Sequence, residues 1–117
     1  MIDKRNFYID GAWVAPTAAT DMAVIDPSTE AEVAVISLGG PSDTDAAVAA
    51  ANAAFPAWSA LSFEDRLAPL ERLYRFYKAR KADMSAAMST EMGAPKALSD
   101  SAQWGAGAGH ILSLIHI

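Results

Sequence analysis

Apolar and polar positions alternate at helical spacing between residues 62 and 78. Apolar side chains recur three or four positions apart, while most charged side chains fall on the opposite side. The apolar set is Leu67, Leu70, Leu73, Tyr74, Phe76 and Tyr77. This spacing predicts an amphipathic helix with one buried face and one face in water.

The two ends of this helical region carry recognisable signals. Ser62 followed by Asp65 resembles a capping box at a helix start. The charged residues 80–83 suggest a break before a second helix, which would end at Gly93 because Pro95 prevents continuation. The second helix carries Met84, Met88 and Met92 at four-residue spacing. We interpret this methionine row as core packing, since no other side chains nearby complete a copper or haem ligand set.

The first 40 residues have the period and turn residues of strands. Residues 7–9 and 12–14 flank Asp10-Gly11, a two-residue signal for a tight hairpin in which both turn positions need a positive φ. Residues 22–25 and 32–36 are rich in β-branched side chains and flank a turn at Asp26-Pro27. We therefore expect two hairpin-like strand pairs.

An alanine-rich helix is expected next, between the strands and Ser62. Ser42 with Asp45 repeats the capping pattern, and Pro56 is expected to kink or end the helix near Ala54. Its predicted inner face consists of Val48, Ala51, Phe55 and Trp58. The many alanines should let this helix pack closely against its neighbour.

Composition narrows the classes of protein. The chain has 117 residues and a formal charge of −5, which is sufficient length for one domain and argues against a nucleic-acid or anionic-membrane partner. There is no cysteine, so the chain contains no disulfide, thiolate zinc site or cysteine nucleophile. The N-terminus lacks an apolar leader pattern, and no apolar run is long enough to span a bilayer. We expect a soluble protein of the cytoplasm.

The last part of the chain contains the one stretch that could be mistaken for a cofactor motif, Gly105-Ala106-Gly107-Ala108-Gly109. A dinucleotide-binding glycine loop must follow a buried strand, whereas residues 99–104 here read as the start of a helix. We favour a helix whose small residues allow close approach of another backbone. His110 and His116 lack metal-ligand spacing and are expected to be packing or surface residues.

Five short motifs, taken together, resemble the N-terminal region of the aldehyde dehydrogenase superfamily. The resemblance covers residues 7 to about 112, and the motifs occur in the order and at the approximate spacing of that family. They are residues 8–13 (YIDGAW), 24–30 (VIDPSTE), 45–58 (DAAVAAANAAFPAW), Arg66 with Leu70, and 91–95 (EMGAP). Asp26 replaces the usual Asn of the Asn-Pro turn, and Met92 stands where Thr is common; both differences are compatible with the family.

The resemblance implies an α/β parent enzyme that oxidises an aldehyde to a carboxylic acid with NAD or NADP. In that family a Cys thiolate attacks the aldehyde, hydride passes to the nicotinamide, and a Glu-activated water hydrolyses the thioester. Those residues and the nicotinamide-binding loops lie downstream of the matched region, so no catalytic, cofactor-binding or metal-binding residue is predicted here. Some relatives hold a monovalent cation near the positions of Val24 and Ile25, but Gln103 occupies the place of the required carboxylate.

The resemblance also implies how this chain relates to its parent. Residues 1–112 would form the N-terminal part of the cofactor-binding domain, with two strand pairs followed by three to four helices. Residues 113–117 depart from the family pattern, which suggests a truncated or frame-shifted reading frame. We expect a fragment that is inactive alone and binds no cofactor, from a homo-oligomeric parent with an aldehyde substrate. The alternative is a standalone helical interaction module without catalysis. Which aldehyde, which nicotinamide cofactor and which oligomeric state are left open by the sequence.

Overall fold

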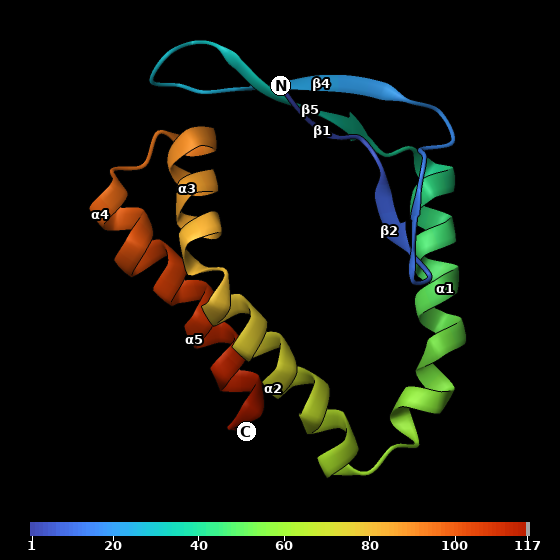
Figure 1. Ribbon diagram of the computed structural model, residues 1–117. Coiled ribbons are helices and arrows are strands. Elements are labelled where there is room, and N and C mark those ends of the chain that lie inside the picture. The colour runs from blue at the N-terminus through green and yellow to red at the C-terminus, as the bar shows by residue number, and fades with distance from the viewer. Residues whose placement is uncertain (117) are drawn as a thin grey trace. The chain divides into compact units, whose positions relative to one another are not determined.

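The computed structural model describes residues 1–116 and divides them into two compact units, Met1–Ala60 and the part of the chain from Leu61 on. Five strands and the helix α1 belong to the first unit, and the remaining helices belong to the second (Figure 1). No helix within residues 1–116 combines the length and the apolar character that crossing a bilayer requires. The two units are described in turn.

The predicted hairpin is confirmed in the first unit. Strands β2 (Phe7–Ile9) and β3 (Ala12–Val14) pair antiparallel, with Tyr8 opposite Trp13. Asp10 has φ 52° and Gly11 has φ 77°, so both turn positions are left-handed, as a type I′ turn requires. Phe7 and Ile9 are half-buried, whereas Tyr8 lies on the exposed face. The hairpin therefore has one packed face and one aromatic face in water.

A separate sheet has the strand order β1-β5-β4. Strands β4 (Thr20–Ile25) and β5 (Glu32–Leu38) form the expected second antiparallel pair, with a register shift between Val24 and Ile25. Strand β1 (Ile2–Lys4) pairs parallel with β5 and was not predicted. Since β5 has a neighbour on both sides, it contains the most buried residues of this sheet, Ala34 and Ser37.

Helix α1 runs from Pro41 to Ser59, so its predicted start and the predicted end near Ala54 are wrong, whereas the alternative of a kink at Pro56 stays a prediction. Its N-cap is Gly40, two residues before the predicted Ser42, because the Asp43 carboxylate accepts the Gly40 N–H at 2.9 Å and Pro41 needs no N–H partner in the first turn. Pro56 does not end the helix near Ala54. The last turn continues past it, and the Ala60 N–H still donates to the Pro56 carbonyl at 3.3 Å.

The predicted inner face of α1 is wrong for Val48, Phe55 and Trp58, whereas Ala51 does line the side toward the hairpin. Val48 is 53% exposed and Phe55 is 64% exposed, while Ala51 and Trp58 are exposed as well. The side of α1 that faces the hairpin is instead made of small residues, which line a hollow with the turn at Asp10 and Gly11; they are Ala47, Ala50, Ala51 and Ala54. The alanines permit this close packing, and the larger apolar side chains point elsewhere.

The second unit begins with the predicted helix pair. Helix α2 (Phe63–Ala79) is capped by Ser62, whose Oγ accepts the Asp65 N–H at 3.1 Å. Its least exposed positions include the predicted set Leu67, Leu70, Tyr74 and Tyr77, whereas Leu73 and Phe76 are exposed. The chain breaks at Arg80, and helix α3 (Lys81–Met92) ends at Gly93, which has φ 66°. The break, the stop and the main apolar face are therefore confirmed.

The rest of the second unit is one helical run with an irregular centre. Helix α4 (Lys96–Leu98) continues through a π-helical segment, η1 (Ser99–Gln103), into helix α5 (Trp104–Ile115). The expected helical start before the glycines is confirmed, although the run begins earlier, directly after Pro95. The expectation that residues 113–117 lie outside the family pattern is not tested; Ile115 ends α5, and Ile117 is outside the described residues.

Hydroxyl groups, not methionines, fill the contact between α3 and the following helical run. Ser85 is 1% exposed and Ser99 is fully buried, and the Ser85 Oγ donates to the Ser99 carbonyl at 3.4 Å. Met84 and Met92 are 39% and 64% exposed. The interpretation of the methionine row as core is thus wrong for these two residues, because α3 turns Ser85 and Ser89 toward Ser99 of the following helical run.

Candidate functional site

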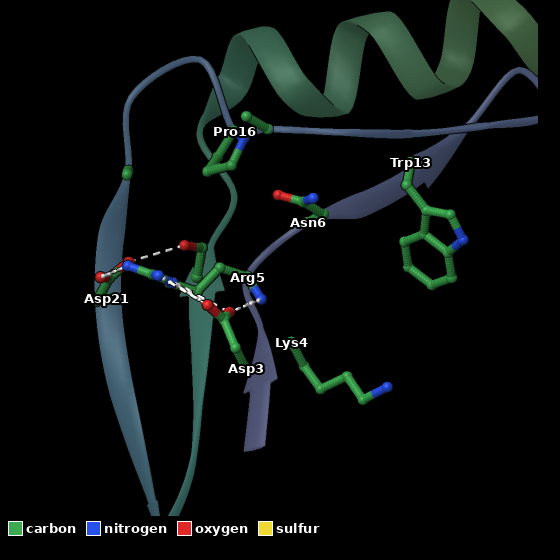
Figure 2. A pocket seen from close by; sticks show the side chains of 10 residues that line it. Asp3, Lys4, Arg5, Asn6, Trp13, Pro16 and Asp21 are labelled. Carbon is green, nitrogen blue, oxygen red and sulfur yellow. Dashed lines mark hydrogen bonds and ion pairs between the residues drawn. The ribbon is translucent and has the colours of Figure 1, made fainter. Parts of the chain in front are cut away.

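A polar hollow of about 470 Å³ lies beside strand β1 in the first unit. Figure 2 shows the side chains that line it, which come from β1, the link between β1 and β2, strand β3, the loop after β3, and the neighbouring strands β4 and β5. The lining residues are Asp3, Lys4, Arg5, Asn6, Trp13, Ala15, Pro16, Ala19, Asp21 and Ser37. No residue of this set was predicted as a site residue from the sequence.

Arg5 is the centre of an ion-pair network in the hollow. Its Nη2 donates to Asp3 at 2.7 Å, and its Nη1 donates to Asp21 at 3.1 Å (Figure 2). Asp21 also accepts the Ser37 Oγ–H at 2.9 Å. The hydrogen bond from the Arg5 side chain lowers the pKa of Asp3, and the two carboxylates raise the pKa of Arg5. Asp3 and Arg5 therefore form a charged pair at neutral pH.

Asp43 fixes the loop that forms one wall of the hollow. Its carboxylate accepts the Thr17 N–H at 2.8 Å and the Thr17 Oγ1–H at 2.9 Å, as well as the Gly40 N–H. The backbone N–H of Thr17 is the main reason that the pKa of Asp43 is lowered, with the Gly40 N–H second. One buried carboxylate thus joins the loop between β3 and β4 to the start of α1.

The hollow has the groups for binding but not for covalent catalysis. Its hydroxyl, on Ser37, donates to the Asp21 carboxylate, and no histidine or cysteine lines the hollow. His110 and His116 lie in the second unit, where both are exposed, as expected for surface residues. Within residues 1–116 no three acidic, histidine or cysteine side chains come together as a metal site.

The glycine-rich stretch is helical and does not fit a nicotinamide dinucleotide. Gly105 to Gly109 lie inside α5, after the π-helical segment and not after a strand, so their N–H groups do not form a loop open to a pyrophosphate. The helix prediction is confirmed. The neighbour that approaches Gly107, however, is the Tyr77 side chain rather than a second backbone. No step of cofactor chemistry is therefore derived from these residues.

An aromatic and cationic stack surrounds the start of α5. The Tyr77 and Trp104 rings are 5.7 Å apart and nearly parallel, and the Lys81 ammonium lies 4.6 Å from the Trp104 ring centre. The Trp104 Nε1–H is buried without an acceptor within residues 1–116. The Gln103 side-chain oxygen accepts the Ser99 Oγ–H at 3.3 Å. These groups join α2, α3 and α5.

The polar hollow has only weak signals in the sequence. Asp3 lies in the three-residue strand β1 and Arg5 directly follows that strand, which has no apolar alternation to reveal it. Asp21 and Ser37 join the network only through the pairing of β4 with β5 opposite each other. The opposite charges of Asp3 and Arg5, two positions apart, were the one usable signal.

The structure consists of strand pairs followed by helices, an arrangement that also occurs in a class of α/β oxidoreductases. A family model for the aldehyde dehydrogenase family matches residues 13–111. The chain belongs to the aldehyde dehydrogenase family, as the five motifs indicated, and the expected α/β fold class is confirmed.

Individual relatives agree with this assignment. The chain is 43% identical to 3-succinoylsemialdehyde-pyridine dehydrogenase of a Pseudomonas species, over 100% of this chain and 25% of that protein. It superposes on an aldehyde dehydrogenase of Bartonella henselae with a TM-score of 0.95 and 44% identity, covering 99% of this chain and 24% of the other. It also matches an aldehyde dehydrogenase C variant of Pseudomonas syringae, in complex with NAD+ and octanal, with a TM-score of 0.89 and 40% identity, covering 92% and 22%. The chain thus spans about a quarter of the length of these relatives.

Proposed function

We propose that this chain is part of an enzyme that oxidises an aldehyde to a carboxylic acid with NAD or NADP. The observation that carries the proposal is the match with the Bartonella henselae aldehyde dehydrogenase, with a TM-score of 0.95 over 99% of the chain. The two proteins are 44% identical in sequence, so the similarity of fold is accompanied by similarity of sequence. In such an enzyme the strand pairs and helices of this chain would surround the cofactor-binding sheet as the N-terminal part of its domain, residues 1–112.

The proposal includes that the 117-residue chain is inactive by itself and binds no cofactor. Oxidation through a thioester needs a cysteine thiolate, and the sequence contains no cysteine. The glycine-rich stretch, which could have held a dinucleotide, is the interior of a helix against Tyr77. A complex of one relative with NAD+ supports NAD+ as the cofactor of the complete enzyme. From the family resemblance we further propose a homo-oligomeric enzyme in the cytoplasm, without a nucleic-acid or membrane partner.

The activity assay is direct. Purified chain is incubated with NAD+ or NADP+ and a set of short and aromatic aldehydes, and absorbance at the wavelength of the reduced nicotinamide is followed. We expect no reduction above a protein-free blank. A complete family enzyme assayed in parallel shows that the substrates and cofactors are competent. Reduced nicotinamide formed by the chain, in proportion to its concentration, would contradict the proposed inactivity.

A second candidate function is a standalone helical interaction module. The observation in its favour is the exposure of large apolar side chains on the helices, including Phe55 at 64% and Phe76 at 69%. The coding DNA after codon 112 separates the two. An open frame that encodes a cysteine-containing catalytic region supports the enzyme, whereas a genuine stop there supports the module.

A further inference from the structure

The helical run α4–η1–α5 meets two different neighbours, one at its start and one further on. Figure 1 shows the run beside α3 first and then beside α2. Ser99 is fully buried in the contact with α3, and Gly107 lies against Tyr77 of α2. Between these two contacts, the Trp104 N–H donates to the Ser99 carbonyl, five residues earlier instead of four. The η1 segment therefore holds one residue more than an α-helical turn in the same place.

The buried positions of α5 are one residue out of phase with Ser99. In a regular α-helix, with about 3.6 residues per turn, the side of the helix that carries Ser99 would next carry Ala106 and His110. Both of these residues are exposed. Gly107 and Ile111, each one position later, are half-buried instead. The additional residue in η1 accounts for this offset, because each residue turns an α-helix by about 100°.

Buried hydroxyl groups hold the π-helical turn from its inner side. The Ser99 Oγ–H donates to the Gln103 side-chain oxygen at 3.3 Å, which joins the first residue of η1 to its last. The hydroxyl oxygens of Ser99 and Ser89 are 3.1 Å apart, so the same group also connects η1 to α3. Ser101 and Ala102, in the middle of the segment, are exposed and take no part in these contacts. The exposed side of the turn therefore accommodates the additional residue.

We infer that η1 is a conformational device that sets the register of α5, by absorbing one residue so that Ser99 faces α3 while Gly107 faces Tyr77. If the segment relaxed to a regular α-helix with all its residues, α5 would turn by about 100° relative to Ser99. Ala106 would then come opposite Tyr77, where a Cβ has no room. Only one of the two contacts could be kept. The device does not depend on the proposed aldehyde oxidation.

The test removes one exposed residue at two different places in the isotope-labelled 117-residue chain. Deletion of Ser101 takes the additional residue out of η1 and leaves the number of residues that a regular α-helix needs to keep both contacts. Deletion of Ala106 is the matched control, because α5 has no residue in excess and the deletion brings Ala108 opposite Tyr77. NOE contacts of the Tyr77 ring with Gly107, and of α3 with Ser99, report on the two contacts.

We expect the unmodified chain and the Ser101 deletion to show both sets of NOE contacts. Amide exchange of residues 102–104 should be roughly fivefold slower in the Ser101 deletion, because a regular helical turn replaces the π-helical one. The Ala106 deletion should lose the contact of Gly107 with Tyr77, and its exchange in α5 should be roughly fivefold faster. Loss of either contact or faster exchange in the Ser101 deletion would overturn the inference. So would an intact Gly107 contact in the Ala106 deletion, or the absence of both contacts from the unmodified chain.

Discussion

Gly107 lies directly against the phenol ring of Tyr77. A Cβ built at residue 107 would overlap the Tyr77 hydroxyl and approach the ring carbon that bears it to 2.9 Å. The ring cannot easily move away, because it stacks on Trp104 and its hydroxyl donates to the Trp104 carbonyl at 3.3 Å. The contact between α2 and α5 therefore depends on the missing side chain at residue 107.

The substitution Gly107→Ala should loosen this contact. Overpacking of this kind costs about 1–3 kcal/mol, which corresponds to amide exchange in α5 that is roughly 5- to 150-fold faster. NMR measures the amide exchange rates in α5 directly, so the experiment does not require the chain to unfold in a cooperative thermal transition. Gly105→Ala and Gly109→Ala are matched controls, because a Cβ at either residue meets nothing within 4 Å. They should slow exchange, since alanine favours a helix by about 0.5–1 kcal/mol over glycine. Equal effects of all three substitutions would show that Tyr77 does not constrain Gly107.

The turn between β2 and β3 should fail when Gly11 is replaced by valine. Gly11 has φ 77°, and a Cβ at this position would have no other atom within 4 Å. The free-energy cost of the substitution therefore comes from the backbone conformation alone. A left-handed conformation costs a β-branched residue about 1–2 kcal/mol or more. NOE contacts between Tyr8 and Trp13 report on the strand pair and should weaken or vanish in Gly11→Val. Gly11→Asn is the control, because asparagine tolerates this conformation, and it should keep the contacts. Retention of the hairpin in the valine variant would refute the prediction.

The loop that Asp43 holds should detach in acid. The carboxyl has its pKa lowered from 3.8 in the folded chain by the N–H groups of Thr17 and Gly40, so the folded state favours its ionised form. Its contribution to stability is therefore complete above pH of about 4 and is lost as the pH falls through the lowered pKa. The Thr17 and Gly40 amide signals should move toward unfolded positions over that interval.

The matched variant for this acid transition is Asp43→Asn. Asparagine keeps one acceptor oxygen but does not titrate. The Thr17 amide of this variant should therefore be less protected from hydrogen exchange, and its NMR signal should not change with pH below 5. A Thr17 transition that persists unchanged in Asp43→Asn would assign the effect to another carboxyl. Asp3 is the first candidate to examine, because its pKa is lowered by Arg5 in the same unit.

Local signals in the sequence predicted most of the elements. Asp10-Gly11, the Ser62 cap and Gly93 each fix a boundary by backbone conformation or a single hydrogen bond, and the structure has all three where they were expected. The failures concern long-range partners. Ser42 was predicted as the N-cap. The helix starts earlier because the Asp43 carboxylate accepts hydrogen bonds from the N–H groups of both Gly40 and Thr17. A pattern along one segment does not contain that second contact.

The hollow was missed for the same reason. Arg5 and Asp3 are neighbours in sequence, but Asp21 and Ser37 reach them only after β4, β5 and β1 pair in that order. The burial of the methionine row in α3 and of the apolar row in α1 was predicted wrongly for a different reason. Their spacing shows which side of a helix is apolar, yet burial needs a partner, and the described residues provide none for Met92 or Phe55.

The exposed apolar side chains lead to the last prediction, on how the chain behaves in solution. Val48, Phe55, Phe76 and Met92 are all more than half exposed, and together with Trp13 they leave several large apolar groups in water. At about 25 cal/mol per Å², several hundred Å² of unburied apolar area is on the order of 10 kcal/mol, comparable with the entire stability of an ordinary domain. The chain should therefore be loosely packed at these faces or self-associate.

We expect a helical far-UV circular dichroism spectrum, binding of the dye ANS, and a broad thermal transition. Light scattering at increasing concentration should show growth in mass. Phe76→Lys, on the exposed side of α2, should reduce dye binding and association, whereas the conservative control Phe76→Leu should change neither by much. A monodisperse monomer with a cooperative melt and negligible dye binding would contradict the prediction. That outcome would also favour the standalone module over part of a larger enzyme, because it would mean that the helices need no further partner to be stable.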